Sequence, residues 1–304
     1  SSTATNVPNC LVRWVTPAGI PLHVTHLTKQ FGTFVAVDDL TFTVQPARIT
    51  GFLGPNGAGK TTTMRMLLGL VRPTSGQALI GDHRYQDLPN PMKVVGSALE
   101  ATNFHPGRSG RDHLRVLADA SGTPHARVDE LLELVGIPAA ARQRAGGYSM
   151  GMRQRLGLAA ALLADPDVVI LDEPANGLDP EGIRWLRSFL RHLASQGKTV
   201  LISSHMLAEA DHIVDDIVII ANGRIVAQGP IQQLRGEPTV FVRTSDAGAL
   251  ASALTAGGLL NAPAGPDGLS VRTPDPARVG DLALAAGLPI HELRPQASDL
   301  EDLF

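Results

Sequence analysis

The chain has 304 residues with a formal net charge of −3, and this length predicts about two domains. Hydrophobic residues make up 43 % of it and charged residues 18 %, which excludes the disordered, collagen-like and low-complexity classes. The balance of charge argues against a generally basic nucleic-acid binder. The single cysteine, Cys10, excludes an internal disulfide framework and a multi-thiolate metal site.

Residues 1–21 show no hydrophobic period and no secretion signal, so they predict a loose leader. The rest of the chain carries clear periods of two or of 3.6 residues. These periods predict, in chain order, strands at 22–27, 40–44 and 47–53, a helix at 61–70, a mostly helical region at about 93–155, and strands at 168–171, 199–203, 214–220 and 224–227.

The composition changes after Gly236, where 4 basic residues stand against 9 acidic ones, while the rest of the chain holds 22 against 20. We therefore expect a first domain at 22–235 and a small acidic α+β domain at 236–304. A charge-free run at 247–266 has the length of a membrane helix. Because it consists mainly of Ala and Gly and is broken by Pro, it predicts a short surface helix and a loop.

A glycine-rich loop follows the strand predicted at 47–53 and fits the phosphate-binding pattern G-x-x-x-x-G-K-[ST]. Its residues are Gly54, Pro55, Asn56, Gly57, Ala58, Gly59, Lys60 and Thr61. The backbone N–H groups of such a loop and the N-terminus of the next helix bind phosphate oxygens. We expect Lys60 to reach the β and γ phosphates, Thr61 to bind Mg²⁺ and Thr62 to add a phosphate contact. The alternative is a glycine turn that matches by chance, which the strand before it and the helix after it disfavour.

The strand predicted at 168–171 ends in two carboxylates, Asp172 and Glu173. Ligands of parallel sheets bind at the carboxyl ends of the strands. We therefore expect Asp172 to hold Mg²⁺ through water and Glu173 to polarise the attacking water as the general base. The alternative is a strand that merely ends in surface acids, and the turn residues that follow, with Pro174 first, make it less plausible.

Two further turns have a functional and a purely structural interpretation. His205 ends the strand predicted at 199–203, and it either caps the strand or donates a hydrogen bond that positions a water beside a γ phosphate. Ser149 precedes a helical run, and it is either a simple N-cap or part of an anion site with Gly151. Within its own subunit that anion site would have no phosphate to bind, which suggests the nucleotide of a second subunit.

In this order, the residues resemble the ATP-binding subunit of an ATP-binding cassette (ABC) transporter over about 22–235. The matched motifs are Walker A at Gly54–Thr61, the signature at Ser149, Met150, Gly151 and Met152, Walker B at Val168–Glu173, the D-loop at Asp179 and the switch histidine at His205. Phe31 matches the aromatic residue that stacks on adenine, with a core residue as the alternative. The signature of the family often reads Leu-Ser-Gly-Gly-Gln, so Met150 stands at the place of its first glycine.

This resemblance implies an α/β fold: a P-loop NTPase (RecA-like) core with an antiparallel β subdomain, a helical subdomain at about 93–155, and here the small C-terminal α+β domain. It also implies ATP and Mg²⁺ as cofactors and a head-to-tail dimer, for which we expect a second copy of this chain. Two ATP molecules would be sandwiched, each between one subunit's loop and the other's signature. Separate membrane permease subunits are the expected partners, with the chain held peripherally on the cytoplasmic membrane face and no nucleic acid bound.

Glu100 falls where the family usually has the glutamine of the Q-loop, which touches Mg²⁺. A glutamate there resembles cassettes of lantibiotic and bacitracin immunity exporters, and the single cassette with an extension resembles daunorubicin-type resistance exporters. Glu100 is therefore a further candidate for the metal, unless the loop is misplaced by one residue.

The first functional hypothesis is the ATPase subunit of a bacterial exporter of a drug, antibiotic or peptide. The second is a soluble ABC ATPase acting on ribosomes or DNA, which usually carries two cassettes or a long coiled coil. The third is an importer subunit. For residues 236–304, the alternatives are stabilisation of the dimer and regulation or docking.

Overall fold

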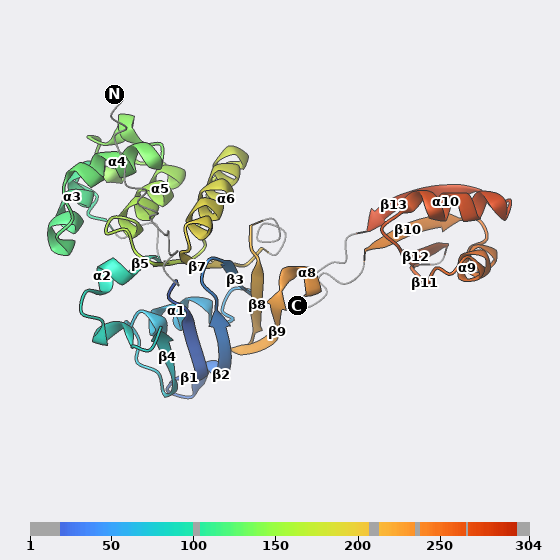
Figure 1. Ribbon diagram of the computed structural model, residues 1–304, viewed down its shortest axis with the longest axis horizontal. Coiled ribbons are helices and arrows are strands. Elements are labelled where there is room, and N and C mark those ends of the chain that lie inside the picture. The colour runs from blue at the N-terminus through green and yellow to red at the C-terminus, as the bar shows by residue number, and fades with distance from the viewer. Residues whose placement is uncertain (1–18, 100–103, 207–212, 235–237, 266, 297–304) are drawn as a thin grey trace, which may run out of the picture.

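The computed structural model describes residues 19–99, 104–206, 213–234, 238–265 and 267–296. Within these ranges the strands form three sheets (Figure 1). The first is antiparallel, with the order β2-β1-β4, and its strands are β1 (Leu22–Phe31), β2 (Phe34–Val44) and β4 (Ser75–Ile80). In β2, Phe42 and Val44 are buried while Thr41 and Thr43 are exposed, so the alternation in the sequence sets which face meets the core.

The second sheet has six strands in the order β5-β6-β7-β3-β8-β9. The strands are β3 (Ile49–Leu53), β5 (Val95–Ala98), β6 (Val168–Leu171), β7 (Thr199–Ser204), β8 (Asp216–Ala221) and β9 (Arg224–Pro230). All neighbours are parallel except β8 and β9, which form the hairpin predicted at Asn222-Gly223. In β6, Val168 and Ile170 join one hydrophobic core and Val169 and Leu171 the other, because a parallel sheet is covered on both faces.

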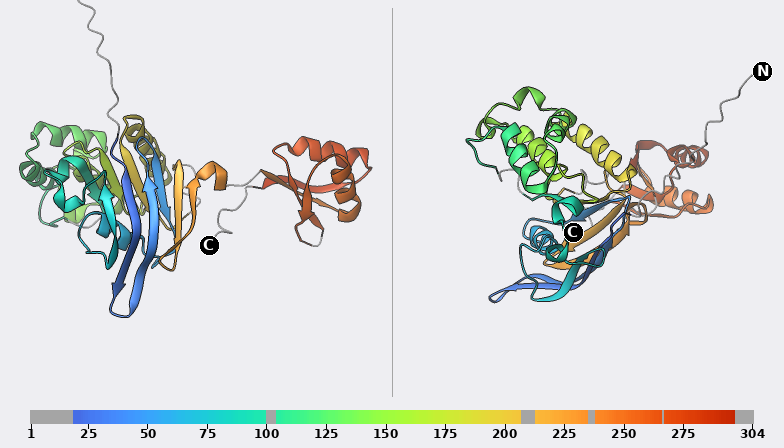
Figure 2. Two further views of the ribbon diagram at one scale, coloured as in Figure 1. Left: turned by 60° about the horizontal axis from the view of Figure 1, so that its bottom comes forward. Right: turned by 60° about the vertical axis from the view of Figure 1, so that its left-hand side comes forward.

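The helices divide between those two cores. The core beneath the antiparallel sheet takes α1, and the other takes α3, α4, α5 and α6, which lie together in Figures 1 and 2. Their bounds are α1 (Lys60–Leu67), α3 (Gly110–Ser121), α4 (Ala126–Leu134), α5 (Met150–Ala161) and α6 (Pro180–Ser195). Shorter helical segments are η1 (Tyr85–Asp87), α2 (Pro91–Val94), η2 (Pro138–Ala140), η3 (Ala145–Gly147) and α8 (Ile231–Leu234).

The mostly helical region expected from residue 93 differs at its start, where Val95–Ala98 is strand β5. Four residues are too few to show a period of two, which is why the sequence pattern misses this strand. Gly96 lets α5 approach it, since a Cβ there would lie 1.8 Å from the Ala161 carbonyl oxygen. The parallel sheet therefore has one more strand beneath the helices than the sequence predicts.

The third sheet lies in the C-terminal part and is antiparallel, with the order β11-β12-β10-β13. The elements follow as β10 (Thr239–Thr244), α9 (Ala247–Ala256), β11 (Asn261–Pro263), β12 (Gly268–Arg272), α10 (Pro276–Ala285) and β13 (Ile290–Gln296). This βαββαβ arrangement is the ferredoxin-like one. Leu250 and Leu254 of α9 are fully buried against the sheet, so the helix expected at the surface contributes a core face.

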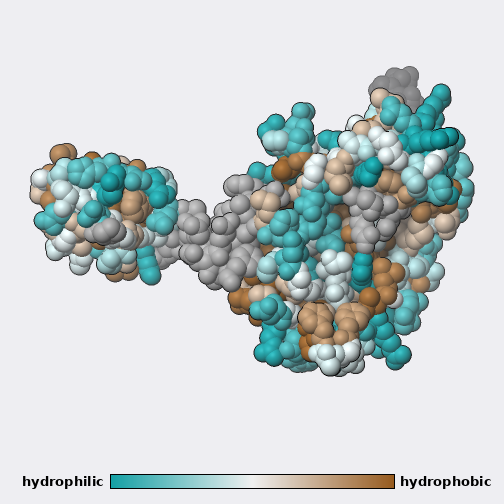
Figure 3. Space-filling view, turned by 180° about the vertical axis from the view of Figure 1, so that it is seen from behind, coloured by the Kyte–Doolittle hydropathy of each residue, from teal (hydrophilic) through white to brown (hydrophobic). Residues whose placement is uncertain are grey.

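No helix in the ranges that the structure describes is both long and apolar enough to cross a bilayer. On the face shown in Figure 3, hydrophilic side chains are spread widely, with small hydrophobic patches between them.

Candidate functional site

The phosphate-binding loop joins β3 to α1, as the sequence predicts. At two of its glycines another backbone segment comes so close that a side chain would not fit. A Cβ on Gly54 would lie 2.2 Å from the Ile220 carbonyl oxygen, and one on Gly59 would lie 2.5 Å from the Ala36 carbonyl oxygen. Gly59 also has a φ of +107°, which L side chains rarely adopt. The loop is thus held between β2 and β8 in a shape that excludes larger residues.

Lys60 begins α1 and points into this loop, with only 6 % of its surface exposed. Its ammonium group donates hydrogen bonds to the carbonyl oxygens of Gly54 (2.7 Å) and Pro55 (3.3 Å). It also lies 3.5 Å from a carboxylate oxygen of Glu173. A buried ammonium with three donors at this place can exchange these partners for phosphate oxygens.

The other loop residues lie around Lys60. Ala58 is buried and its carbonyl oxygen accepts a hydrogen bond from the Gly223 N–H (3.1 Å), while Asn56 is exposed and Thr62 half-buried. One side of the loop is therefore held by backbone contacts, and the other side is open to a ligand.

Asp172 stands at the carboxyl end of β6 beside the first turn of α1. One oxygen of its carboxylate accepts a hydrogen bond from the Thr61 hydroxyl at 2.6 Å, and the other accepts one from the Ser203 hydroxyl. The Asp172 N–H donates to the Ala98 carbonyl oxygen at 2.8 Å. Hydroxyl and carboxylate oxygens are the hard donors that Mg²⁺ prefers, so Thr61 and Asp172 fit this ion. Glu100, the third residue expected near the metal, lies outside the described residues.

Glu173 has a φ of +49°, a left-handed conformation that is uncommon outside glycine. Its N–H donates to the Ser203 hydroxyl oxygen at 2.8 Å. One carboxylate oxygen lies 2.9 Å from Nδ1 of His205 and the other 3.5 Å from the Lys60 ammonium. The structure therefore brings together the three residues expected to act in catalysis, Lys60, Glu173 and His205.

Ser203 is a site residue that sequence reasoning missed. It is fully buried on β7, and its hydroxyl bridges the Asp172 carboxylate and the Glu173 backbone. The signal was a serine at the end of an apolar strand adjacent to the acidic one, but one hydroxyl among buried residues does not by itself point to a partner.

Ser149 is the N-cap of α5, and its hydroxyl oxygen accepts a hydrogen bond from the Met152 N–H at 3.2 Å. Among the described residues, the hydrogen bonds of Ser149 stay within this turn and none reaches the loop at 54–62. Met150 is about half exposed. Asp179 caps α6 by accepting from the Gly182 N–H at 2.8 Å. Ser149 and Asp179 are thus held by hydrogen bonds to the helices that they cap, and their surroundings are open to solvent.

Phe31 ends β1 at the turn of the β1–β2 hairpin, and 49 % of its surface is exposed. The alternative that it is a core residue is therefore wrong. The Lys29 ammonium lies 4.7 Å from the centre of its ring, which leaves Phe31 as an exposed aromatic surface beside a cation.

Residues 37–176 match the family described as "ABC transporter", and residues 238–301 match a domain of unknown function (DUF8746). The bacitracin transport ATP-binding protein BcrA of Bacillus licheniformis is 42 % identical over 217 residues, which are 70 % of this chain and 71 % of BcrA. The uncharacterized ABC transporter ATP-binding protein YhcH of Bacillus subtilis is 36 % identical over 93 % of this chain and 94 % of its own length. The Nod factor export ATP-binding protein I of Burkholderia lata is 40 % identical over 69 % of this chain and 70 % of its own length.

Among solved structures, the ATP-binding subunit of an ABC transporter superposes with a TM-score of 0.65 at 30 % identity, covering 70 % of this chain and 91 % of that one. This similarity confirms the predicted α/β fold class of a P-loop NTPase core. The relatives named here are transporter subunits, and nothing in them favours action on ribosomes or DNA. The chain belongs to the ATP-binding subunits of ABC transporters, which hydrolyse ATP to power transport through a membrane permease.

Proposed function

We propose that this chain drives an exporter of a drug, antibiotic or peptide through a separate permease, from the cytoplasmic face of the membrane where it is held peripherally. The observation that carries the ATPase part is the cluster of Glu173, Lys60 and His205 at the mouth of the phosphate loop. The direction and the type of cargo are supported by the similarity to BcrA and to the Nod factor export protein. We propose no nucleic-acid partner, in keeping with the net charge of −3.

The geometry suggests how the residues of this chain act on ATP. The backbone N–H groups of residues 56, 57 and 59 and the Lys60 ammonium bind the phosphates, so Lys60 exchanges the Gly54 and Pro55 carbonyls for phosphate oxygens. This exchange also takes Lys60 away from Glu173 and leaves that carboxylate free to accept a proton from water. His205, hydrogen-bonded to Glu173, holds the water or the γ phosphate in place. Phe31 stacks on the adenine from the tip of the β1–β2 hairpin.

Thr61 and Asp172, with Glu100 as a further candidate, would hold Mg²⁺. The ion would neutralise charge that develops on the transferred phosphoryl group. Thr62 would add a phosphate contact from the first turn of α1.

The active assembly in this proposal is a head-to-tail pair of two copies of the chain. Each copy offers the turn at 149–152 and Asp179 to the nucleotide held by the other copy's loop. The support is that Ser149 and Gly151 stand at a helix N-terminus, which attracts anions, while their hydrogen bonds do not reach the loop of their own chain among the described residues. Residues 22–235 would form the cassette, 236–304 an accessory domain and 1–21 a leader.

Affinity capture of the tagged chain from its native membranes in mild detergent tests this function. We expect a stoichiometric protein with several membrane spans. Coexpression of that protein with this chain in a bacitracin-sensitive bacterium should then raise the concentration of drug that stops growth, whereas coexpression with Glu173→Gln should not. Recovery of ribosomal or DNA-repair proteins without a membrane protein would contradict the proposal.

A further inference from the structure

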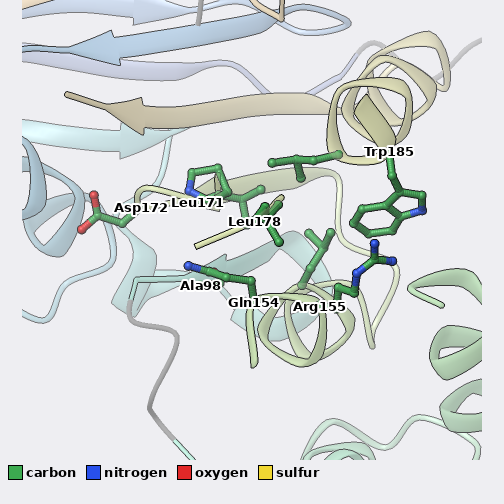
Figure 4. A pocket seen from close by; sticks show the side chains of 10 residues that line it. Ala98, Gln154, Arg155, Leu171, Asp172, Leu178 and Trp185 are labelled. Atoms are coloured by element: carbon green, nitrogen blue, oxygen red, sulfur yellow. The ribbon is translucent and has the colours of Figure 1, made fainter. Parts of the chain in front are cut away.

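One side of α5 faces the segment that leads into α6. Met150, Gln154 and Leu158 are spaced four residues apart, so they share one side of the helix. Gln154 donates a hydrogen bond from Nε2 to the Asn176 carbonyl oxygen at 3.2 Å. Leu158 lines a small cavity together with Pro174 and Leu178. Figure 4 shows this cavity, with Gln154 of α5 and Leu178 labelled. The helix that begins at the signature turn thus hydrogen-bonds to Asn176 and borders a cavity together with Pro174 and Leu178.

Met150 makes the first of these contacts. A Cβ on Gly177 would lie 2.3 Å from Cγ and 3.1 Å from Cβ of Met150, so the Met150 side chain rests directly on the Gly177 backbone. Gly177 has a φ of +75° and no side chain, which lets the two approach. Leu178 completes the contact, since its Cδ2 would lie 3.5 Å from a Cβ on Gly151.

Arg155, the residue after Gln154, makes a third connection. The Arg155 guanidinium lies over the ring of Trp185 in α6, 4.3 Å from its centre, and the two side chains are neighbours in Figure 4. Arg155 also donates to the Val135 carbonyl oxygen at 2.8 Å. Because Asp179 is the N-cap of α6, this contact connects the helix that follows the D-loop to the helix of the signature.

We propose that Met150 is a positioning residue that clamps the signature turn, residues 149–152, to the D-loop segment, residues 174–179, of its own subunit. The two elements that a subunit offers to its partner's nucleotide then move as one rigid unit. Gln154 and Arg155 continue this clamp along α5. The inference rests on the shared site proposed above and adds a coupling within each subunit to it.

Mixed dimers of the full chain test the clamp. One copy carries Ser149→Ala and the other Lys60→Ala. Dimers of either copy alone have no complete site, whereas the mixed dimer keeps one, built from Lys60 of the first copy and the signature of the second. Met150→Ala is then added either to the second copy, whose signature is in use, or to the first copy.

We expect a kcat roughly tenfold lower when Met150→Ala is in the Lys60→Ala copy, whose signature is in use, than when it is in the Ser149→Ala copy. The KM for ATP should differ little between the two mixtures, because the nucleotide is held mainly by the loop. Met150→Leu, which keeps a γ carbon over Gly177, should restore the rate. Leu134→Ala, which shortens another half-exposed side chain of the same helical region, serves as the matched control and should not alter it.

If Met150→Ala lowers kcat equally in either copy, the loss is a folding effect and the clamp is wrong. If it lowers kcat in neither copy, the clamp is wrong as well. Urea unfolding of each variant separates a folding effect from a positioning effect. If the parent mixture without Met150→Ala is itself inactive, both the shared site and the clamp are wrong. If the parent mixture is active and Met150→Ala has the same effect in either copy, only the clamp is wrong.

Discussion

Ser203 connects the two carboxylates of the site through a single hydroxyl group. It donates to Asp172 and accepts from the N–H of Glu173, whose side chain meets Lys60 and His205. A hydroxyl is suited to this position because it can donate and accept at the same time. The positions of Asp172 and Glu173 are therefore set by one buried side chain on the neighbouring strand.

Ser203→Ala should lower kcat by about 10- to 100-fold. The substitution removes a donor to Asp172 and leaves the Glu173 N–H without its acceptor, a loss of about 1–3 kcal/mol for a buried group. Phosphate release under saturating ATP measures the effect. Ser204→Ala is the matched control, since within the described part of the chain the Ser204 hydroxyl bonds to the backbone of Met206 and to neither carboxylate of the site. A wild-type kcat for Ser203→Ala would show that Glu173 is positioned by other contacts.

Glu173→Gln should reduce hydrolysis by about 10²–10⁴-fold and leave ATP binding intact, because an amide cannot accept the proton of the water. Lys60→Ala should instead abolish tight nucleotide binding. Titration with a fluorescent ATP analogue and single-turnover hydrolysis separate the two effects. An unchanged turnover rate for Glu173→Gln would remove this residue as the base.

At the scale of the elements, α3 holds a buried histidine, His113, whose ring lies 5.7 Å from that of Phe104 in an edge-to-face arrangement. Burial, together with the nearby Arg108, lowers the pKa of His113 below its usual 6.5. The Nδ1 atom is also buried and has no hydrogen-bond partner within the described structure. The folded chain thus keeps this ring neutral at a pH where the unfolded chain protonates it.

The helical part should therefore lose stability as the pH falls below about 6.5, because the unfolded state then binds a proton that the folded state does not. Urea unfolding at pH 7.5 and pH 5.5 measures the change in the free energy of unfolding. His113→Gln should show a smaller loss over this interval, and His83→Gln, at an exposed position, should behave as the wild type does. A loss as large in His113→Gln as in the wild type would assign the pH dependence to other groups.

The elements show which features the sequence can predict. Apolar strands, the loop of 54–61 and the hairpin at Asn222-Gly223 follow from local rules of periodicity and backbone conformation, and the structure contains all three. The exposed state of Phe31 and the bridge made by Ser203 do not follow, because they depend on contacts with distant segments. Strand β5 does not follow either, because four residues are too few to show a period of two and their pairing partner, β6, is distant in the sequence.

At the scale of the whole molecule, the C-terminal sheet has a hydrophobic core of its own, built from residues between Val240 and Ala283. No residue of this core belongs to either core of the cassette. A chain ending at residue 235 should therefore fold and bind ATP with unchanged affinity. Calorimetry should show two transitions for the full chain and one for the shortened chain. A shortened chain that unfolds without cooperativity would show that the two parts depend on each other.

The left-handed backbone of Glu173 has a consequence for the stability of the molecule. Away from left-handed positions, alanine stabilises a protein more than glycine does, but at a φ of +49° the order should reverse, because the Cβ costs about 1–2 kcal/mol. Glu173→Gly should accordingly melt about 2–4 °C above Glu173→Ala, whereas at Ser188 on the exposed side of α6 the alanine variant should melt higher. The same order at both positions would show that the backbone at Glu173 is relaxed. A glycine at position 173 would relax the left-handed backbone but would lack the carboxylate that we propose as the general base, so this position exchanges backbone stability for the proposed chemistry.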